Sequence, residues 1–270
     1  MPVLGVNGID LYYDDLNPSG DTRTPVLLIT GLGGVGSSWG PLTPLIAQDR
    51  RVIVPDHRGC GRSTRTVEGQ SIPQIAADMA GLIRELDCGP VHVVGSSTGG
   101  AIGQLMAARH RSTVRSLSLV ASWVRSDEYF NAWFQLRKQV LLGLSPEEYV
   151  ALTQFLLYSP DYWSKETPER LSEREAMLAG GGLNAKEIAS ARIDMIMAHD
   201  AVGELSAVNV PAIVLTGSHD AISPPSMGRA LASAIPGAQF ITVHGAGHFV
   251  HEEQPQLVRD TVVRFLDTMA

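Results

Sequence analysis

One segment in the first half of the chain constrains the fold more than any other. Residues 91–94 are a run dominated by valine, residues 95–100 are glycine, serine and threonine, and small residues continue through 101–108. An apolar run of this kind predicts a buried strand, and the segment beyond the turn predicts a helix. Glycines at 95 and 99 would let the strand and the helix approach each other without Cβ clashes. We therefore expect a strand, a sharp turn and a helix, with a serine at the apex.

The pattern Gly-x-Ser-x-Gly in this segment selects Ser97 as the apex. Centring it on Ser96 would put Val94 and Thr98 at the glycine positions. In this setting the pattern is typical of a nucleophile elbow, in which a serine in a strained backbone conformation presents its hydroxyl clear of the sheet. The five residues alone are equally compatible with a glycine-rich turn that holds incidental serines, so the rest of the chain must decide.

Composition and charge narrow the classes of partner. The chain has 270 residues, 44% of them hydrophobic, which fits one large α/β domain or a core with a modest insert. Its formal charge of −7 argues against nucleic acid or an anionic membrane as the main partner. No apolar run approaches the ~18 residues of a membrane span. We expect a small-molecule substrate, and a monomer or homodimer.

The cysteines and the N-terminus bear on the compartment. Cys60 and Cys88 lie in different segments, which predicts neither a disulfide nor a zinc site. The first ten residues lack the basic and apolar regions of a signal peptide. We therefore expect a cytoplasmic protein with free thiols, no metal and no other cofactor.

Strand and helix signals alternate along most of the chain. Residues 9–13 predict one half of an N-terminal hairpin. Apolar runs predict further strands at 26–30, 51–56, 91–94, 114–121, 211–217 and 239–243, and helical spacing occurs at 39–47, 71–86, 101–108, 226–234 and 255–269. Ser71 is a plausible N-cap, and Gly89 follows the end of that helix. Repeated β-α units predict a mostly parallel central sheet with helices on both faces.

The alternation of strand and helix signals stops between residues 125 and 208. This stretch has helical signals only and concentrates aromatic residues, Trp133 among them. We predict a core of residues 1–124 and 209–270, with a helical cap, or lid, inserted at 125–208. Most of the aromatic side chains are expected to pack within this insert, and a few to face a pocket.

A base and an orienting carboxylate follow two later strands. A serine hydroxyl needs a nearby base that is itself oriented by an acid, and such groups gather at the carboxyl ends of parallel strands. Asp220 is the carboxylate after the strand at 211–217, and His248 lies in the glycine loop after 239–243. The order Ser97, Asp220, His248 is the one expected of an α/β-hydrolase.

Other residues compete for the two partner roles. The rival bases are His244 and His251, and the rival acids are Asp127 and Glu128. Backbone donors for an oxyanion are expected from Leu32, in the glycine loop after 26–30, and from Thr98 at the start of the helix. The loop at 31–36 lacks the nucleotide-binding glycine fingerprint and the Walker lysine.

Four motifs together resemble the α/β-hydrolase superfamily over essentially the whole chain: residues 30–34, residues 56–63, residues 95–100, and Gly247-His248 followed by Glu253 and Pro255. Thr30 and Ser96 depart from the family, which often has histidine at both positions. Within it, the runs 32–39 and 123–125 are most similar to those of enol-lactone hydrolases and of the aminoacrylate hydrolases of pyrimidine breakdown.

The resemblance and the residues together predict a serine hydrolase that cleaves a small carboxylic ester or lactone through an acyl-enzyme. Ser97, His248 and Asp220 would form the catalytic triad, and Leu32 and Thr98 the oxyanion hole. Carbon–carbon, amide or carbamate hydrolysis, perhydrolysis, and a ligand receptor without turnover remain open. Candidate substrate contacts are Trp123, Trp133 and Arg125; Arg125 would bind a second carboxylate if the substrate has one, and is otherwise a surface cation.

Overall fold

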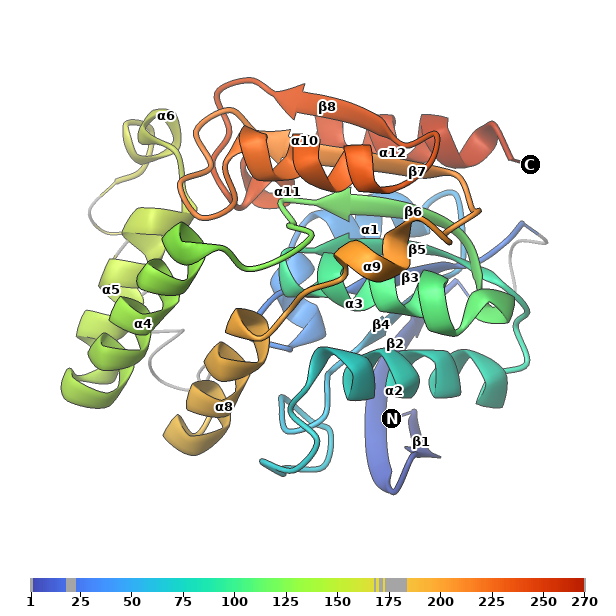
Figure 1. The fold of residues 1–270 in the computed structure, drawn as a ribbon, viewed down its shortest axis with the longest axis horizontal. Coiled ribbons are helices and arrows are strands. Elements are labelled where there is room, and N and C mark those ends of the chain that lie inside the picture. The colour runs from blue at the N-terminus through green and yellow to red at the C-terminus, as the bar shows by residue number, and fades with distance from the viewer. Residues whose placement is uncertain (1, 18–22, 168, 170–171, 173–183, 270) are drawn as a thin grey trace.

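In the computed structural model, which describes residues 2–17, 23–167, 169, 172 and 184–269, the chain forms one eight-stranded sheet with helices on both faces (Figure 1). The strands are β1 (Val3–Val6), β2 (Ile9–Leu16), β3 (Val26–Ile29), β4 (Val52–Pro55), β5 (Val91–Ser96), β6 (Val114–Val120), β7 (Ala212–Gly217) and β8 (Gln239–Val243). Their order is β1-β2-β4-β3-β5-β6-β7-β8. Only the pairs β1–β2 and β2–β4 are antiparallel. This is the mostly parallel sheet of the predicted α/β-hydrolase fold.

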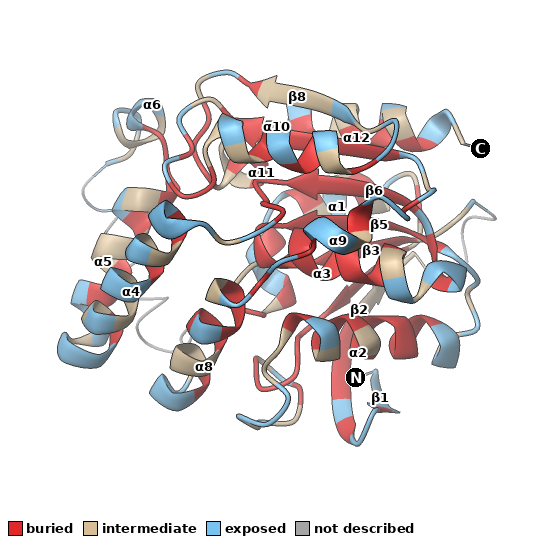
Figure 2. Cartoon of the chain, in the orientation of Figure 1, coloured by how far each residue is buried: buried red, intermediate tan, exposed pale blue. Residues whose placement is uncertain are grey.

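The central strands are buried on both faces, as their continuous apolar runs predict. In β3, Leu27 and Ile29 pack into the core on one face of the sheet, whereas Val26 and Leu28 pack into the core on the other. Figure 2 shows the same burial along the central strands. Because parallel strands end at a common edge, this arrangement brings the loops after β3, β5, β7 and β8 together.

Helices cover the two faces unequally. The core that contains Leu27 also holds residues of α2 (Ile72–Glu85), α3 (Thr98–Arg109) and α10 (Pro225–Ala234). The other core holds residues of α1 (Leu42–Ala47) and α12 (Pro255–Asp267). The helix predicted at 39–47 is shorter than expected: a 3₁₀ turn at Gly36–Trp39 precedes α1, and Gly40, with φ +50°, separates the two.

Between β6 and β7, the regular elements of the described residues are helices. They are α4 (Glu128–Gly143), α5 (Pro146–Leu157), α6 (Pro160–Trp163), α8 (Lys186–Met197) and α9 (Val202–Leu205). The side chains of Asp127, Ser145 and Ser159 accept N-cap hydrogen bonds at the starts of α4, α5 and α6. We call residues 125–208 the insert. Figure 1 shows α4, α5 and α8 on one side of the sheet.

The two ends of the insert meet each other and the core. Arg125 and Asp200 form an isolated antiparallel bridge. Helix α9 packs on α3, where Glu204 accepts two hydrogen bonds from Arg109 at 2.6 and 2.7 Å. The last part of the insert therefore lies against the core rather than over the site. Within the described ranges, every helix falls short of the length and hydropathy that a membrane span requires.

Two deeply buried histidines are held neutral by the fold. His199 packs edge-on against Trp123, with ring centroids 5.8 Å apart, and His251 packs against Trp39 at 4.8 Å. Burial lowers the pKa of each to about 4. The unfolded chain therefore binds protons that the folded chain refuses between about pH 6.5 and pH 4.

We predict that the free energy of unfolding falls as the pH drops from about 7.5 to about 5, by about 2 kcal/mol for each of His199 and His251. The sign follows because both pKa values are depressed on folding, so the stabilisation is complete above the unfolded pKa and is lost below it. Urea unfolding followed by circular dichroism measures this slope. His199→Gln should reduce the slope, because it removes one of the two imidazoles with a lowered pKa. Equal stability at both pH values would contradict the prediction.

Candidate active site

Ser97 occupies the strained turn that the Gly-x-Ser-x-Gly pattern predicts. It lies between β5 and α3 with φ +52° and ψ −116°, a region that side-chain-bearing residues rarely adopt. The crossing is too close for side chains. A Cβ on Gly95 would lie 2.3 Å from the carbonyl oxygen of Gly99, and one on Gly99 would lie 1.9 Å from that of Ile29. The glycines therefore permit the turn, and the turn directs the Ser97 hydroxyl toward His248.

His248 and Asp220 complete a hydrogen-bonded chain with Ser97. His248 Nε2 lies 3.0 Å from Ser97 Oγ, and its Nδ1 lies 2.9 Å from Asp220 Oδ2. Because a carboxylate can only accept, Nδ1 carries the proton and Nε2 is free to accept one from the serine. All three side chains are buried to at least nine-tenths. The backbone N–H of His248 donates to the carbonyl of Leu157, the last residue of α5, at 2.8 Å.

The Asp220 carboxylate is held by its own loop. Its Oδ1 accepts from the backbone N–H groups of Ile222 and Ser223, both at 2.9 Å. The Ser223 hydroxyl lies 2.9 Å from Asp220 Oδ2, and also 2.9 Å from the carbonyl oxygen of Ala121. These bonds fix the carboxylate toward His248. Ser223 was not among the predicted site residues; its only signal in the sequence is its place in the short polar loop after β7 that also carries Asp220.

The rival residues lie elsewhere. His244 is exposed, and His251 Nε2 faces the carbonyl of Ser38 at 3.4 Å. Asp127 caps α4 through the N–H of Phe130, and Glu128 is exposed in the first turn of that helix. Among these histidines, His248 is therefore the one that bonds Ser97. Among the acids, Asp220 is the one that bonds His248 Nδ1.

Two backbone N–H groups beside the serine are not used in the hydrogen bonds of the described fold. A Cβ built on Gly31 would lie 3.5 Å from Ser97 Cβ, so the loop after β3 touches the nucleophile. Within the described part of the chain, the N–H groups of Leu32 and Thr98 donate to no acceptor. Thr98 is also the first residue of α3, where the helix dipole favours negative charge. These are the donors that the sequence assigned to an oxyanion hole.

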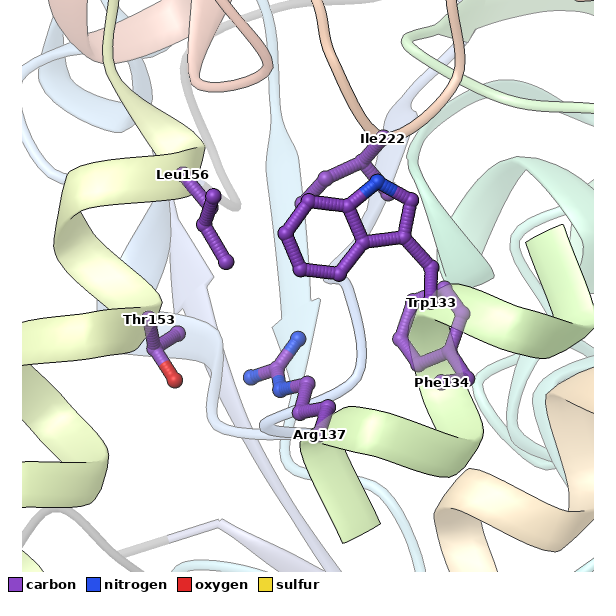
Figure 3. A pocket seen from close by; sticks show the side chains of 6 residues that line it. All are labelled: Trp133, Phe134, Arg137, Thr153, Leu156 and Ile222. Carbon is purple, nitrogen blue, oxygen red and sulfur yellow. The ribbon is translucent and has the colours of Figure 1, made fainter. Parts of the chain in front are cut away.

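A pocket lies between α4, α5 and the Asp220 loop. Its lining residues are Trp133, Phe134, Arg137, Thr153, Leu156 and Ile222 (Figure 3). Trp133 is tied to the loop, since its Nε1 donates to the hydroxyl of Tyr129 at 3.1 Å and that hydroxyl donates to the carbonyl of Ala221. Because Ile222 both lines the pocket and donates to Asp220, the pocket borders the catalytic chain.

The other two predicted substrate contacts do not line this pocket. Trp123 is 1% exposed, stacks on Phe130 at 4.5 Å, and donates from Nε1 to Ser126 Oγ. Its role in the structure is to fill the core at the root of the insert. Arg125 is exposed and lies in the bridge with Asp200. The cation of the pocket is instead Arg137, which helical spacing in the insert did not single out.

The described residues offer no metal-binding group of three or more His, Cys, Asp or Glu side chains. Both cysteines are free, Cys60 buried and Cys88 half-buried, and burial raises the pKa of both thiols. Neither thiol is therefore activated as a nucleophile. The chemistry this site can supply is proton transfer through His248, attack by Ser97 and backbone hydrogen bonding to a developing negative charge.

Comparisons with known proteins identify the family of the chain. A family model described as alpha/beta hydrolase fold matches residues 24–255. A protein of Azorhizobium caulinodans named "Putative carbamate hydrolase RutD" is 32% identical, with 98% of each chain covered. The crystal structure of the enol-lactonase from Burkholderia xenovorans LB400 superposes with a TM-score of 0.87 at 28% identity, covering 98% of this chain and all of that one. A thermophilic esterase from Thermogutta terrifontis gives 0.82 at 28% identity, covering 97% of this chain and 94% of that one. The chain belongs to the α/β-hydrolase family.

Proposed function

We propose that this hydrolase cleaves a small carboxylic ester or lactone through a Ser97 acyl-enzyme. The observation that carries the proposal is the unbroken hydrogen-bonded chain from Asp220 through His248 to the strained Ser97. A buried serine, an imidazole and an oriented carboxylate in this order can remove and return one proton, which is what acyl transfer requires.

In acylation, a proton moves from Ser97 to His248 and then to the leaving group. Ser97 Oγ attacks the carbonyl carbon while His248 Nε2 takes the hydroxyl proton, and Asp220 stabilises the imidazolium that forms. The carbonyl oxygen becomes an oxyanion, which the N–H groups of Leu32 and Thr98 bind. His248 then gives its proton to the leaving alcohol oxygen, or to the ring oxygen of a lactone, and the carbon–oxygen bond breaks.

Deacylation uses the same groups again. A water molecule enters where the alcohol left, His248 takes one of its protons, and the resulting hydroxide attacks the acyl-enzyme. The second tetrahedral intermediate forms in the same hole. Its collapse returns the proton to Ser97 Oγ and releases the acid, so the enzyme ends in its starting state.

A carbamate is the second candidate substrate class. The name of the Azorhizobium relative supports it, and the same machinery would serve: Ser97 attacks the carbamate carbonyl, His248 protonates the departing alcohol, and water then hydrolyses the carbamoyl-enzyme. The two classes differ in the reactivity of the carbonyl group rather than in the residues needed. A paired assay with an ester and a carbamate of the same alcohol distinguishes them.

The pocket supports a substrate that carries an acidic group. Arg137 Nε donates to the hydroxyl of Tyr149 at 2.9 Å, and Arg137 forms no ion pair with a described carboxylate. Figure 3 shows its guanidinium directed between α4 and α5, with Thr153 and Leu156 opposite. The buried Thr153 hydroxyl has no hydrogen-bond partner among the described residues. A carboxylate on the substrate would pair with the Arg137 guanidinium.

Ser97→Ala should abolish covalent labelling by a fluorophosphonate and lower ester hydrolysis roughly 10⁴-fold or more, because the nucleophile is lost. Intact-protein mass spectrometry and a p-nitrophenyl ester assay measure the two effects. Ser96→Ala is the matched control, since this serine is adjacent but belongs to β5, and it should still be labelled. Wild-type protein that takes no label and turns over no ester, lactone or carbamate would show that the proposed function is wrong.

Asp220→Asn should lower kcat by roughly 10³- to 10⁴-fold, because His248 loses the acceptor that holds its Nδ1 proton in place. Asp127→Asn, at the rival acid, should leave kcat unchanged, since asparagine can still cap α4. Steady-state kinetics with one ester compare the variants. A loss of kcat of similar size in Asp127→Asn would show that Asp220 is assigned incorrectly as the acid.

Arg137→Gln should raise KM for the mono-p-nitrophenyl ester of glutaric acid by about 10-fold or more, because a hydrogen bond to a charged group contributes about 1.5–3 kcal/mol. KM for p-nitrophenyl pentanoate, which has the same chain without the carboxylate, should stay the same. Arg125→Gln is the control at the exposed arginine of the insert. If Arg125→Gln alone changed the preference, the acidic group would bind there instead.

A further inference from the structure

The loop that carries the Leu32 N–H is tied down at every carbonyl. The loop comprises Gly31, Leu32, Gly33 and Gly34, and we call it the oxyanion loop. Two of its ties come from the core backbone. The carbonyl of Gly31 accepts from the N–H of Gly34 at 3.1 Å, and the carbonyl of Gly34 accepts from the N–H of His57 at 2.7 Å.

The other two ties come from the insert. The carbonyl of Leu32 accepts from Arg192 Nε at 2.6 Å, and the carbonyl of Gly33 accepts from Asn184 Nδ2 at 2.9 Å. Arg192 lies in the second turn of α8, and Asn184 precedes the same helix by two residues. One helix of the insert therefore fixes the two middle carbonyls of a core loop.

These ties bear directly on the direction of the Leu32 N–H. In a planar trans peptide the carbonyl and the N–H point in opposite directions. The tie at Gly31 orients the peptide plane that contains the Leu32 N–H, and the tie from Arg192 orients the plane on the other side of the Leu32 Cα. With both planes held, the N–H cannot turn away from the serine. An oxyanion donor must be in place before charge develops, because reorienting it costs energy at that moment.

Arg192 is also unusual in its surroundings. It is fully buried, its Nη1 donates to Gln70 Oε1 at 3.0 Å, and its Nη2 donates to His57 Nδ1 at 3.0 Å. Burial, with the neighbouring guanidinium, holds the pKa of His57 well below its ordinary value, so His57 is neutral and can accept. Among the described residues no carboxylate pairs with Arg192.

A buried guanidinium without an anionic partner is costly, and neutral acceptors repay only part of that cost. The partners that Arg192 does have are the oxyanion loop and two side chains beneath it. A negative charge that forms against this loop would be attracted by the guanidinium, because the interior screens charge weakly. The buried cation thus stabilises the tetrahedral state, whereas it destabilises the resting enzyme.

We propose that Arg192 is a positioning residue for the oxyanion hole: from the insert, it holds the Leu32 carbonyl and so keeps the Leu32 N–H aimed at the developing oxyanion. The insert then serves catalysis as well as substrate binding, because seating α8 completes the hole. The inference rests on the proposed function. It predicts that Arg192 affects the tetrahedral state far more than the planar ground state.

The test compares Arg192→Met, Arg192→Lys and Asn184→Ala with the wild type, using the rate of Ser97 labelling by a fluorophosphonate. This readout does not depend on knowing the substrate. Arg192→Met should slow labelling by at least about 10-fold and by up to roughly 10²- to 10³-fold, the range for loss of one oxyanion donor. Arg192→Lys should recover part of the rate through one donor, and Asn184→Ala should lose less. With a p-nitrophenyl ester, kcat should fall while KM stays within about threefold.

A second pair of measurements separates positioning from a loss of stability. A boronic acid, which becomes tetrahedral on Ser97, should bind Arg192→Met at least about tenfold more weakly, whereas a carboxylic acid product should bind equally well. Arg50→Met is the matched control, because Arg50 is also buried but bonds Asp267 in α12. It should lower the melting temperature without changing the labelling rate.

The outcomes are distinct. Labelling of Arg192→Met at the wild-type rate, or a rise in KM with unchanged kcat, would overturn the inference and leave the proposed function standing. Equal losses in Arg192→Met and Arg50→Met would assign Arg192 a purely structural role, which also overturns it. If the wild type itself takes no label, both proposals fail. If Arg192→Met does not fold, the labelling rates of Arg192→Lys and Asn184→Ala test the inference instead. Rates equal to that of the wild type in both variants would overturn it.

Discussion

The close crossing of β5 and α3 is the constraint on which the rest of the site depends. Ser97 can keep φ +52° only because the strand and helix on either side of it pack at distances that exclude side chains from Gly95 and Gly99. The strain is repaid by surrounding bonds: the N–H of Ser97 donates to the carbonyl of Val120 at 2.8 Å, and the Ser122 hydroxyl donates to the carbonyl of Ser97 at 3.0 Å. A serine held in this way points its hydroxyl at one place, and the loops after β3, β7 and β8 are arranged around that place.

The insert is joined to this arrangement at several points rather than resting on it. The carbonyl of Leu157 accepts from the N–H of His248, and the Ser159 hydroxyl donates to Glu253, whose Oε1 also accepts from the N–H of Gly247. Burial raises the pKa of Glu253, and these hydrogen bonds oppose the shift. The loop that carries the base is therefore bonded to the end of α5, and the oxyanion loop to α8. A change in the seating of the insert would reach both the base and the oxyanion hole.

The parts of the site that obey a local rule were predictable from the sequence. Ser97, Asp220 and His248 each follow a strand of a parallel sheet, and such ends meet at one edge, so their order and position could be inferred without a structure. The parts that depend on which way a helix faces were not. Trp123 and Arg125 were candidate substrate contacts, with a surface cation as the alternative for Arg125. Neither lines the pocket, because the indole is buried in the core and the arginine is exposed. Arg137 and Arg192 could not be chosen from among the arginines of the insert, because their partners lie 12 to 160 positions away in the sequence.

This division has a physical reason that extends to specificity. The core supplies the proposed bond-breaking groups through backbone geometry, which many sequences can satisfy as long as glycine stands where a side chain would clash. The insert supplies long side chains, whose ends are placed by packing over several turns of helix. One of them, Arg192, reaches inward to the oxyanion loop and has a protein acceptor at each of its three nitrogens, whereas Arg137 keeps donors that no described carboxylate neutralises. A cation whose donors are used within the protein can orient the catalytic apparatus, and one whose donors remain unused can select a substrate. Two arginines of the same insert are thus suited to different tasks by what they bond rather than by where they lie in the chain.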